Sequence, residues 1–257
     1  MKYLRILLWS FSFTVFRSLF CVSVSSADYR VEDIRSTGTI EGTVFFPGET
    51  PPPAMFAAGD PLCPHGIAQN HLLVKHTNLA LQNAVVILDV DHGIPIKPVR
   101  GQIATQGCMF SPRIQWLPAG SSLQLKNEDG AHHEIHAVQQ DVTAFDVPLP
   151  GKQTLARRPL IHLGFYKINC QRHLWERAWI YVSEHPYVAI TDSDGHFLIQ
   201  NVPPGHYSIR VWHEGWTETD KDPDGRIEYI PMGQTRDVKV APDHTVQVIF
   251  DSLEALR

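Results

Sequence analysis

The segment Ile40-Glu41-Gly42-Thr43-Val44-Phe45-Phe46 alternates apolar side chains with small or polar ones. This period of two is typical of a β-strand with one buried face. The strand is followed by Pro47-Gly48 and by the extended stretch Pro51-Pro52-Pro53, which end it. Outward from this segment, short strand-like runs and Gly/Pro turns recur to the C-terminus, and no ten positions show a convincing helical period. The sequence therefore predicts an all-β protein made of sandwiches or barrels.

The other predicted strands share short lengths and enrichment in β-branched or aromatic residues. They are expected at 72–74, 84–90, 114–116, 123–126, 165–169, 178–182, 188–191, 196–199, 207–212, 238–240 and 245–250. The strands at 114–116 and 123–126 flank the turn Pro118-Ala119-Gly120, and we expect them to form a hairpin.

The composition excludes several classes of protein. The chain has 257 residues, of which 43% are hydrophobic, enough for one large or two small domains. Only 19% of the residues are charged, which argues against disorder. The net charge of -5 argues against a nucleic-acid-binding face.

Residues 1–27 resemble a secretory signal peptide. Lys2 and Arg5 precede the mainly apolar run 6–16, and Ser25-Ser26-Ala27 supplies small residues for cleavage. Arg17 interrupts the apolar stretch, so a stable membrane span is the weaker interpretation. We expect a periplasmic or secreted protein beginning near Asp28, with an uncleaved anchor as the alternative.

Signal removal would take Cys21 and leave Cys63, Cys108 and Cys170. An odd number of cysteines in an oxidising compartment suggests one disulfide and one thiol with another role, as ligand or reactive group.

The chain divides by composition into three parts after the signal. Residues 100–186 are dense in the His, Cys and Trp residues that suggest chemistry, and residues 187–257 are expected to form a second small β unit. The strands of residues 28–99 resemble that last unit in character. We therefore expect them to complete its sandwich, with the His/Cys module inserted between.

The strongest chemical signal is the loop Cys170-Gln171-Arg172-His173, with the cluster His132-His133-Glu134-Ile135-His136 about forty residues upstream. A thiolate and an imidazole three positions apart can reach one metal ion from a tight loop. A second imidazole from a distant strand would complete the Cys-His-His plane that copper electron-transfer sites use.

The run Gly120-Ser121-Ser122-Leu123-Gln124-Leu125-Lys126-Asn127-Glu128-Asp129, followed by His133, resembles the plastocyanin pattern, and Cys170-x-x-His173 resembles its second ligand loop. The segments 191–197, 202–207 and 211–214 are similar to those of exported plastocyanin-like proteins with a carboxypeptidase-regulatory-like domain. The resemblance implies a cupredoxin-like β-sandwich combined with a small transthyretin-like or carboxypeptidase-regulatory-like one.

The same resemblance implies one mononuclear copper ion held by His133, Cys170 and His173. His136 has a counterpart in similar proteins and is a candidate ligand or neighbouring group, although strand alternation would point it away from His133 unless the chain bends. The position of the usual axial Met, after Trp175, holds Glu176. Glu176 either ligates the ion, as a glutamate does in the cupredoxin relative nitrosocyanin, or is a surface charge.

With Cys170 assigned to the metal, Cys63 and Cys108 become the expected disulfide partners. His213, in the second unit, is expected to serve packing rather than the metal.

The resemblance implies a non-enzymatic role in one-electron transfer or copper holding, with a redox protein as a possible partner. Three alternatives stay open: a closed zinc site, a buried free cysteine without metal, and a structural or carbohydrate-binding sandwich.

Overall fold

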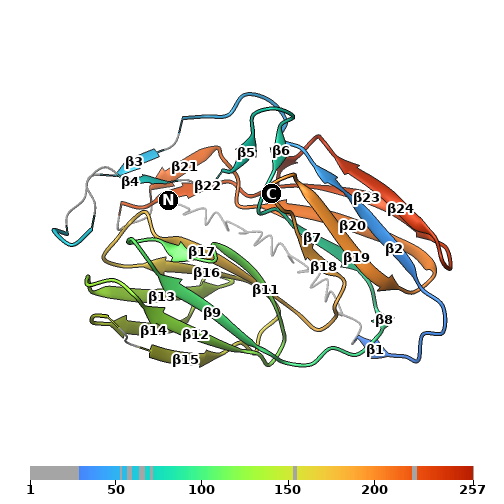
Figure 1. Cartoon of the computed structure of the whole chain (residues 1–257), viewed down its shortest axis with the longest axis horizontal. Helices are drawn as coiled ribbons and strands as arrows, with labels where there is room; N and C mark the ends of the chain where they lie inside the picture. The colour runs from blue at the N-terminus through green and yellow to red at the C-terminus, as the bar shows by residue number, and fades with distance from the viewer. Residues whose placement is uncertain are drawn as a thin grey trace, which may run out of the picture.

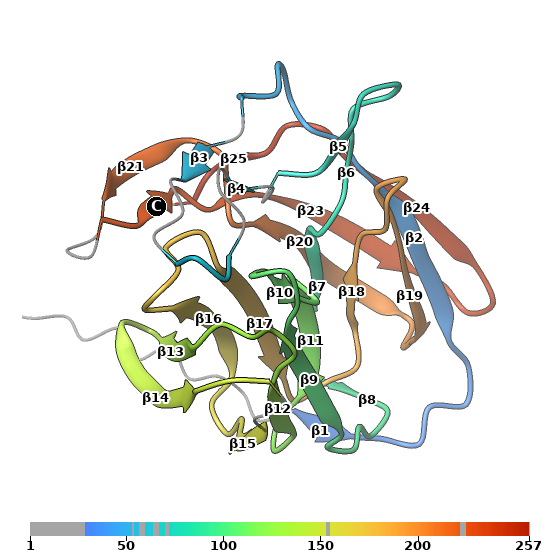
Figure 2. The same cartoon turned by 60° about the vertical axis from the view of Figure 1, so that its left-hand side comes forward.

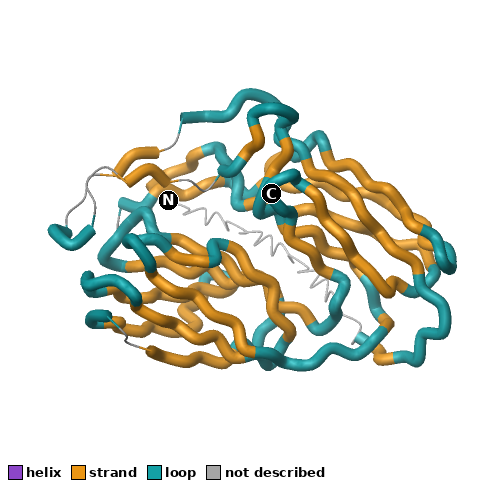
Figure 3. The backbone as a smooth tube through the Cα atoms, viewed as in Figure 1, coloured by secondary structure: helices purple, strands orange, loops and turns teal. Residues whose placement is uncertain are grey.

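A computed structural model describes residues 29–52, 54–56, 60–63, 67–69, 72–152, 155–221 and 225–256. The predicted signal segment 1–27, with Cys21, lies outside these residues. In the described ranges every regular element is a strand, which confirms the all-β prediction (Figure 3). No helix in this part of the chain has the length and apolar character needed to cross a membrane.

The first sandwich is made from the middle of the chain. One sheet has the order β10-β9-β12-β15, and the other has the order β11-β17-β16-β13-β14 (Figure 1). Leucine, isoleucine and valine side chains of both sheets, such as Leu125 and Ile168, meet in the core between them. The strands are β9 (Arg100–Thr105), β10 (Phe110–Ser111), β11 (Ile114–Pro118), β12 (Ser122–Asn127), β13 (His133–Gln139), β14 (Val142–Leu149), β15 (Leu155–Pro159), β16 (Gly164–Cys170) and β17 (Arg177–Ser183).

The second sandwich combines strands from both ends of the chain. Its sheets have the orders β18-β7-β20-β23-β25 and β19-β2-β24, and β2 runs parallel to β24. The strands are β2 (Gly38–Val44), β7 (Val85–Asp89), β18 (Val188–Ile190), β19 (His196–Val202), β20 (Gly205–His213), β23 (Met232–Val240), β24 (Thr245–Phe250) and β25 (Glu254–Ala255). Residues of the two sheets, including Ile40, Ile209 and Phe250, form its core.

The remaining strands form four short two-stranded pairs. They are β1 (Arg30–Val31) with β8 (His92–Gly93), β3 (Ala54–Phe56) with β4 (Ile67–Gln69), β5 (Val74–Lys75) with β6 (Ala80–Leu81), and β21 (Glu218–Lys221) with β22 (Ile227–Tyr229).

The two sandwiches pack against each other through β7, whose two faces are both buried (Figure 2). Val86 and Leu88 point into the core of the second sandwich. Val85 and Ile87 point the other way and join an aromatic cluster that includes Tyr181 and Trp212. The unbroken apolar run of β7 is what a strand covered on both sides requires.

The hairpin prediction for 114–116 and 123–126 is wrong. β11 pairs in parallel with β17, whereas β12 pairs in parallel with β9 in the facing sheet. The turn between them crosses from one sheet to the other: Ala119 N–H donates to Ser183 O and Gly120 N–H donates to Leu160 O. A local turn signal cannot distinguish a hairpin from such a crossing, because the strand partners come from distant sequence.

Candidate metal centre

The candidate site lies at one end of the sheet that contains β13, β16 and β17. β13 begins at His133, β16 ends at Cys170, and β17 begins one residue after Glu176. β16 pairs antiparallel with both β13 and β17. The start of β13, the end of β16 and the start of β17 therefore lie together at the same end of the sheet. Pairing of Ile135 with Cys170 fixes the register that brings His133 to the loop.

The loop 171–176 is closed by its own backbone. Glu176 N–H donates to His173 O at 3.0 Å, and Cys170 N–H donates to Glu176 O at 3.2 Å. Gln171 N–H donates to Glu134 O at 2.8 Å, which ties the loop to β13. These bonds bring Cys170, His173 and Glu176 to one side of a tight turn.

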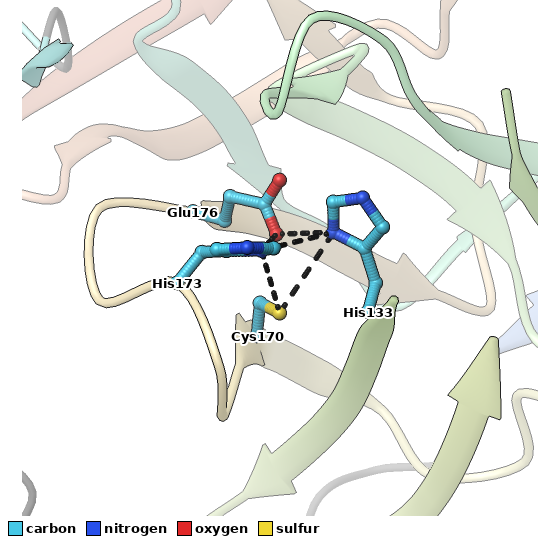
Figure 4. A group of neighbouring side chains, drawn as sticks. All are labelled: His133, Cys170, His173 and Glu176. Carbon is cyan, nitrogen blue, oxygen red and sulfur yellow. Dashed lines mark hydrogen bonds and ion pairs between the residues drawn. The ribbon is translucent and has the colours of Figure 1, made fainter. Parts of the chain in front are cut away.

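Four donor atoms converge on one point (Figure 4). The Nδ1 atoms of His133 and His173 are 3.2 Å apart, and Cys170 Sγ lies 3.9 and 3.6 Å from them, respectively. Glu176 Oε2 lies 2.9 Å from His133 Nδ1 and 3.4 Å from His173 Nδ1.

Glu176 is fully buried, which excludes the surface-charge interpretation of this residue. Its Oε2 points into the donor cluster, and its Oε1 has no hydrogen-bond partner among the described residues. A buried carboxylate with one unsatisfied oxygen is costly unless a cation compensates it. Glu176 therefore belongs to the same buried cluster as His133, Cys170 and His173.

His136 does not belong to the cluster, so its assignment as a ligand is a correction to the sequence analysis. Side chains of β13 alternate between buried and partly exposed positions, with His133 buried and His136 on the other face. His136 Nδ1 instead pairs with Asp146 Oδ1 at 2.7 Å on the neighbouring strand. No bulge falls between positions 133 and 136, so the alternation holds.

The four side chains of the cluster shift one another's pKa values. Burial lowers the pKa of His133, but hydrogen bonds to Cys170 and Glu176 outweigh it and raise that pKa to about 9. The same opposing causes raise the pKa of His173 to about 10. Burial raises the pKa values of Cys170 and Glu176, but hydrogen bonds from the two imidazoles lower both overall. The two imidazoles thus lower the pKa values of the thiol and the carboxyl group, and those two groups raise the pKa values of the imidazoles.

The segment before β13 is held by the side chains of Asn127 and Asp129. Asn127 donates from Nδ2 to Ala131 O and Leu149 O, and its Oδ1 accepts from Asp129 N–H. Asp129 in turn places Oδ2 3.2 Å from His133 Nε2. The contact is an ion-pair distance rather than a hydrogen bond, since His133 Nε2 has no hydrogen-bond partner among the described residues.

Sequence reasoning missed Arg226, a buried residue from the loop before β22. Its guanidinium donates to Cys170 O at 2.7 Å and to Leu174 O at 2.8 Å. Arg226 therefore ties the start of the ligand loop to its middle. It lies more than fifty positions from Cys170, and nothing in its local sequence marks the contact.

The expected disulfide partners Cys63 and Cys108 are joined, and Cys170 is a free buried cysteine. The disulfide packs with Ala131 and Trp175 beside the centre. Trp175 Nε1–H donates to Cys108 O at 2.8 Å.

His213 lies in the second sandwich, where its Nδ1 accepts from Gly215 N–H at 3.0 Å and its ring contacts Trp216. It is absent from the metal-type clusters of the described residues.

The donor set fits a metal ion. Two imidazole nitrogens at the usual bond length from a tetrahedral ion would lie about 3.3 Å apart, close to the separation of the two Nδ1 atoms. One soft sulfur with two imidazoles is the combination that copper sites use, while the carboxylate oxygen is harder. Zinc also accepts this set.

No protein-family model matches this chain, and no curated protein matches its sequence. Among solved structures, a purple cupredoxin from Nitrosopumilus maritimus aligns over 32% of this chain and 99% of its own, at 21% identity and a TM-score of 0.30. A copper-containing nitrite reductase from Thermus scotoductus aligns over 35% of this chain and 24% of its own, at 23% identity and a TM-score of 0.32. A reduced amicyanin variant aligns over 33% of this chain and 82% of its own, at 15% identity and a TM-score of 0.30. Each of these three solved structures aligns with about a third of this chain.

Proposed function

We propose that this chain is an exported protein that binds one copper ion through His133, Cys170, His173 and Glu176, for one-electron transfer or copper holding. The observation that carries the proposal is the convergence of two Nδ1 atoms, one thiol and one carboxylate within 4.8 Å of one another in a fully buried site. A thiolate suits Cu(I), imidazole suits both oxidation states, and a carboxylate favours Cu(II).

The protein's own residues explain why such a centre would change little during a redox cycle. The backbone bonds of the 170–176 loop and the Arg226 contacts hold three of the donors. The fourth donor residue, His133, contacts the Asp129 carboxylate through its Nε2 atom. Donors fixed by the fold need not move when the charge of the ion changes. Bound copper would supply the one-electron step itself.

Export is part of the proposal. It is supported by the Cys63–Cys108 disulfide, because disulfides persist mainly in oxidising compartments. The residues of the predicted signal lie outside the described structure.

The test is an optical and redox titration of the purified protein with Cu(II). We expect one equivalent to bind, with an intense thiolate-to-copper band that disappears on reduction and returns on reoxidation. Retention of the ion through the cycle supports electron transfer, whereas its release on reduction or oxidation supports copper holding. Tight binding of zinc with no such band from Cu(II) would contradict the proposal.

A further inference from the structure

The disulfide lies against the imidazole edges that face away from the proposed copper site. His133 and His173 direct Nδ1 to the donor cluster, which leaves each Nε2 on the opposite edge. Cys63 Sγ lies 3.3 Å from His173 Nε2. Asp60 Oδ2 lies 3.6 Å from the same nitrogen, and Asp129 Oδ2 lies 3.2 Å from His133 Nε2.

These atoms form two further groups of metal-ligand type that share the disulfide. One contains Asp60, Cys63 and His173, and the other contains Cys108, Asp129 and His133; in each, the donor atoms lie within 4.8 Å of one another. Both sulfurs are buried. The two groups meet at the S–S bond, which joins Cys63 of one to Cys108 of the other.

We propose that reduction of the Cys63–Cys108 disulfide creates a second metal site, which binds one Cu(I) ion through the two thiolates. Cu(I) is the ion expected there, because paired thiolates are soft ligands and Cu(I) is a soft cation. Each sulfur has one carboxylate within 4.8 Å, Asp60 beside Cys63 and Asp129 beside Cys108. The inference does not rest on the identity of the ion in the first site.

Cys108 keeps its position without the S–S bond, because other contacts hold it. Asp129 accepts from Gly107 N–H at 2.7 Å and from Cys108 N–H at 3.1 Å. The Trp175 indole holds Cys108 O. On the other side, Cys63 N–H donates to Asp60 O at 3.0 Å. Reduction would therefore leave the Cys63 thiol, 3.3 Å from His173 Nε2, beside a Cys108 thiol that the fold holds in place.

The reduction balances with either a small-molecule thiol or a phosphine as the reductant. Two small-molecule thiols would reduce the disulfide, giving one new disulfide and the two protein thiols. In vitro a phosphine and water give the phosphine oxide and the same two thiols. Cu(I) then displaces both thiol protons and forms two S–Cu bonds, with no change in the oxidation state of copper.

The test uses Cys170→Ser, which removes the thiolate of the first site, so that the two sites can be measured apart. The oxidised and the phosphine-reduced variant are titrated anaerobically with Cu(I) in competition with bicinchoninate, after removal of the phosphine. We expect the reduced variant to take one equivalent more than the oxidised variant. Equal uptake by the two forms would overturn the proposal.

The unsubstituted protein provides an independent measurement if Cys170→Ser does not fold. Its oxidised form should bind one Cu(I) ion and its reduced form two. The double variant Cys63→Ser/Cys108→Ser should bind one Cu(I) ion under reducing conditions. If the oxidised protein binds none, the first site fails while the gain on reduction still decides the second.

A flexible pair of thiols also binds Cu(I), so the reduced Cys170→Ser protein in urea is the matched control. A site built by the fold should hold Cu(I) at least about ten-fold more tightly in the native protein than in urea. Equal affinity in the two states would show that the fold contributes nothing and would contradict the inference.

Discussion

At the scale of single residues, the fourth donor distinguishes this centre. Glu176 follows Trp175, where similar copper loops have methionine, and its carboxylate is buried against both imidazoles. A buried anion stabilises Cu(II) relative to Cu(I), because the ion with the higher charge gains more from it. The charge at position 176 should therefore set the reduction potential of a bound copper ion.

Glu176→Gln should raise that reduction potential. Removal of the anion weakens Cu(II) binding more than Cu(I) binding, and each ten-fold difference corresponds to about 59 mV for one electron. We expect a rise of at least about 59 mV in a spectroscopic redox titration. Glu134→Gln, a partly exposed residue of β13 outside the donor cluster, is the control and should change the potential far less. Equal shifts in both variants would argue against ligation by Glu176.

His185 gives a pH dependence away from the metal centre. Burial and the nearby Arg210 lower its pKa from 6.5 to about 4, so the folded state keeps the ring neutral. The unfolded chain then binds the extra proton first as pH falls. Stability from this group is complete above pH 6.5 and is lost between 6.5 and 4. Denaturant unfolding of His185→Gln across this window should show a weaker decline than the unsubstituted protein; an identical decline would contradict the assignment.

At the scale of single elements, β13 decides which histidine can reach the metal. Residues three apart on a strand face opposite sides, and His133 and His136 obey this rule because no bulge falls between them. Both are histidines within the same short stretch of sequence. They differ only in the face of the strand on which the side chain lies.

His133→Ala should reduce metal affinity by at least about 100-fold, whereas His136→Ala should leave it within about two-fold. The first loses a donor atom, and the second loses only an exposed pair with Asp146. Isothermal titration with Cu(II) measures both, and the two variants control each other. A comparable loss in His136→Ala would mean that the strand faces are assigned wrongly.

At the scale of the whole molecule, the two sandwiches are joined around Glu214. This buried carboxylate accepts from Arg113 Nε at 3.0 Å and from Trp179 Nε1 at 3.1 Å, which links the loop after β20 to the first sandwich. Beside it, Phe165 stacks on Trp212 with ring centres 4.0 Å apart. These contacts join the second sandwich to β16 and β17 of the first, whereas the Arg226 contact to the ligand loop comes from the β21–β22 pair.

Glu214→Ala should destabilise the protein by about 3–5 kcal/mol, because it leaves the largely buried Arg113 without this partner. Asp251→Ala, which breaks the exposed pair with Arg236, should cost at most about 1 kcal/mol. Chemical denaturation of both variants measures the difference. Similar costs for the two would show that Glu214 does not join the sandwiches.

Much of the fold and site could be predicted from short stretches. The strands around residues 40–46, 84–90, 178–182 and 207–212 were evident from β-branched runs and turn residues, and β2, β7, β17 and β20 lie there. By contrast, β13 and β14 were not predicted as strands, because β13 begins within the His-rich segment and its alternation is concealed by polar side chains. The division of the chain at residues 100 and 187, and the carboxypeptidase-regulatory-like character of the second unit, stay predictions.

By itself the sequence determined the all-β class and the candidate donors Cys170, His173 and His133, because strand periodicity and ligand chemistry are properties of nearby residues. Only the tertiary structure decided that Glu176 turns inward, that His136 turns away and that Arg226 clamps the ligand loop. Each of these depends on which distant strand lies alongside. The free energy that selects such a neighbour comes from burial summed over both sandwiches, and no local segment carries it.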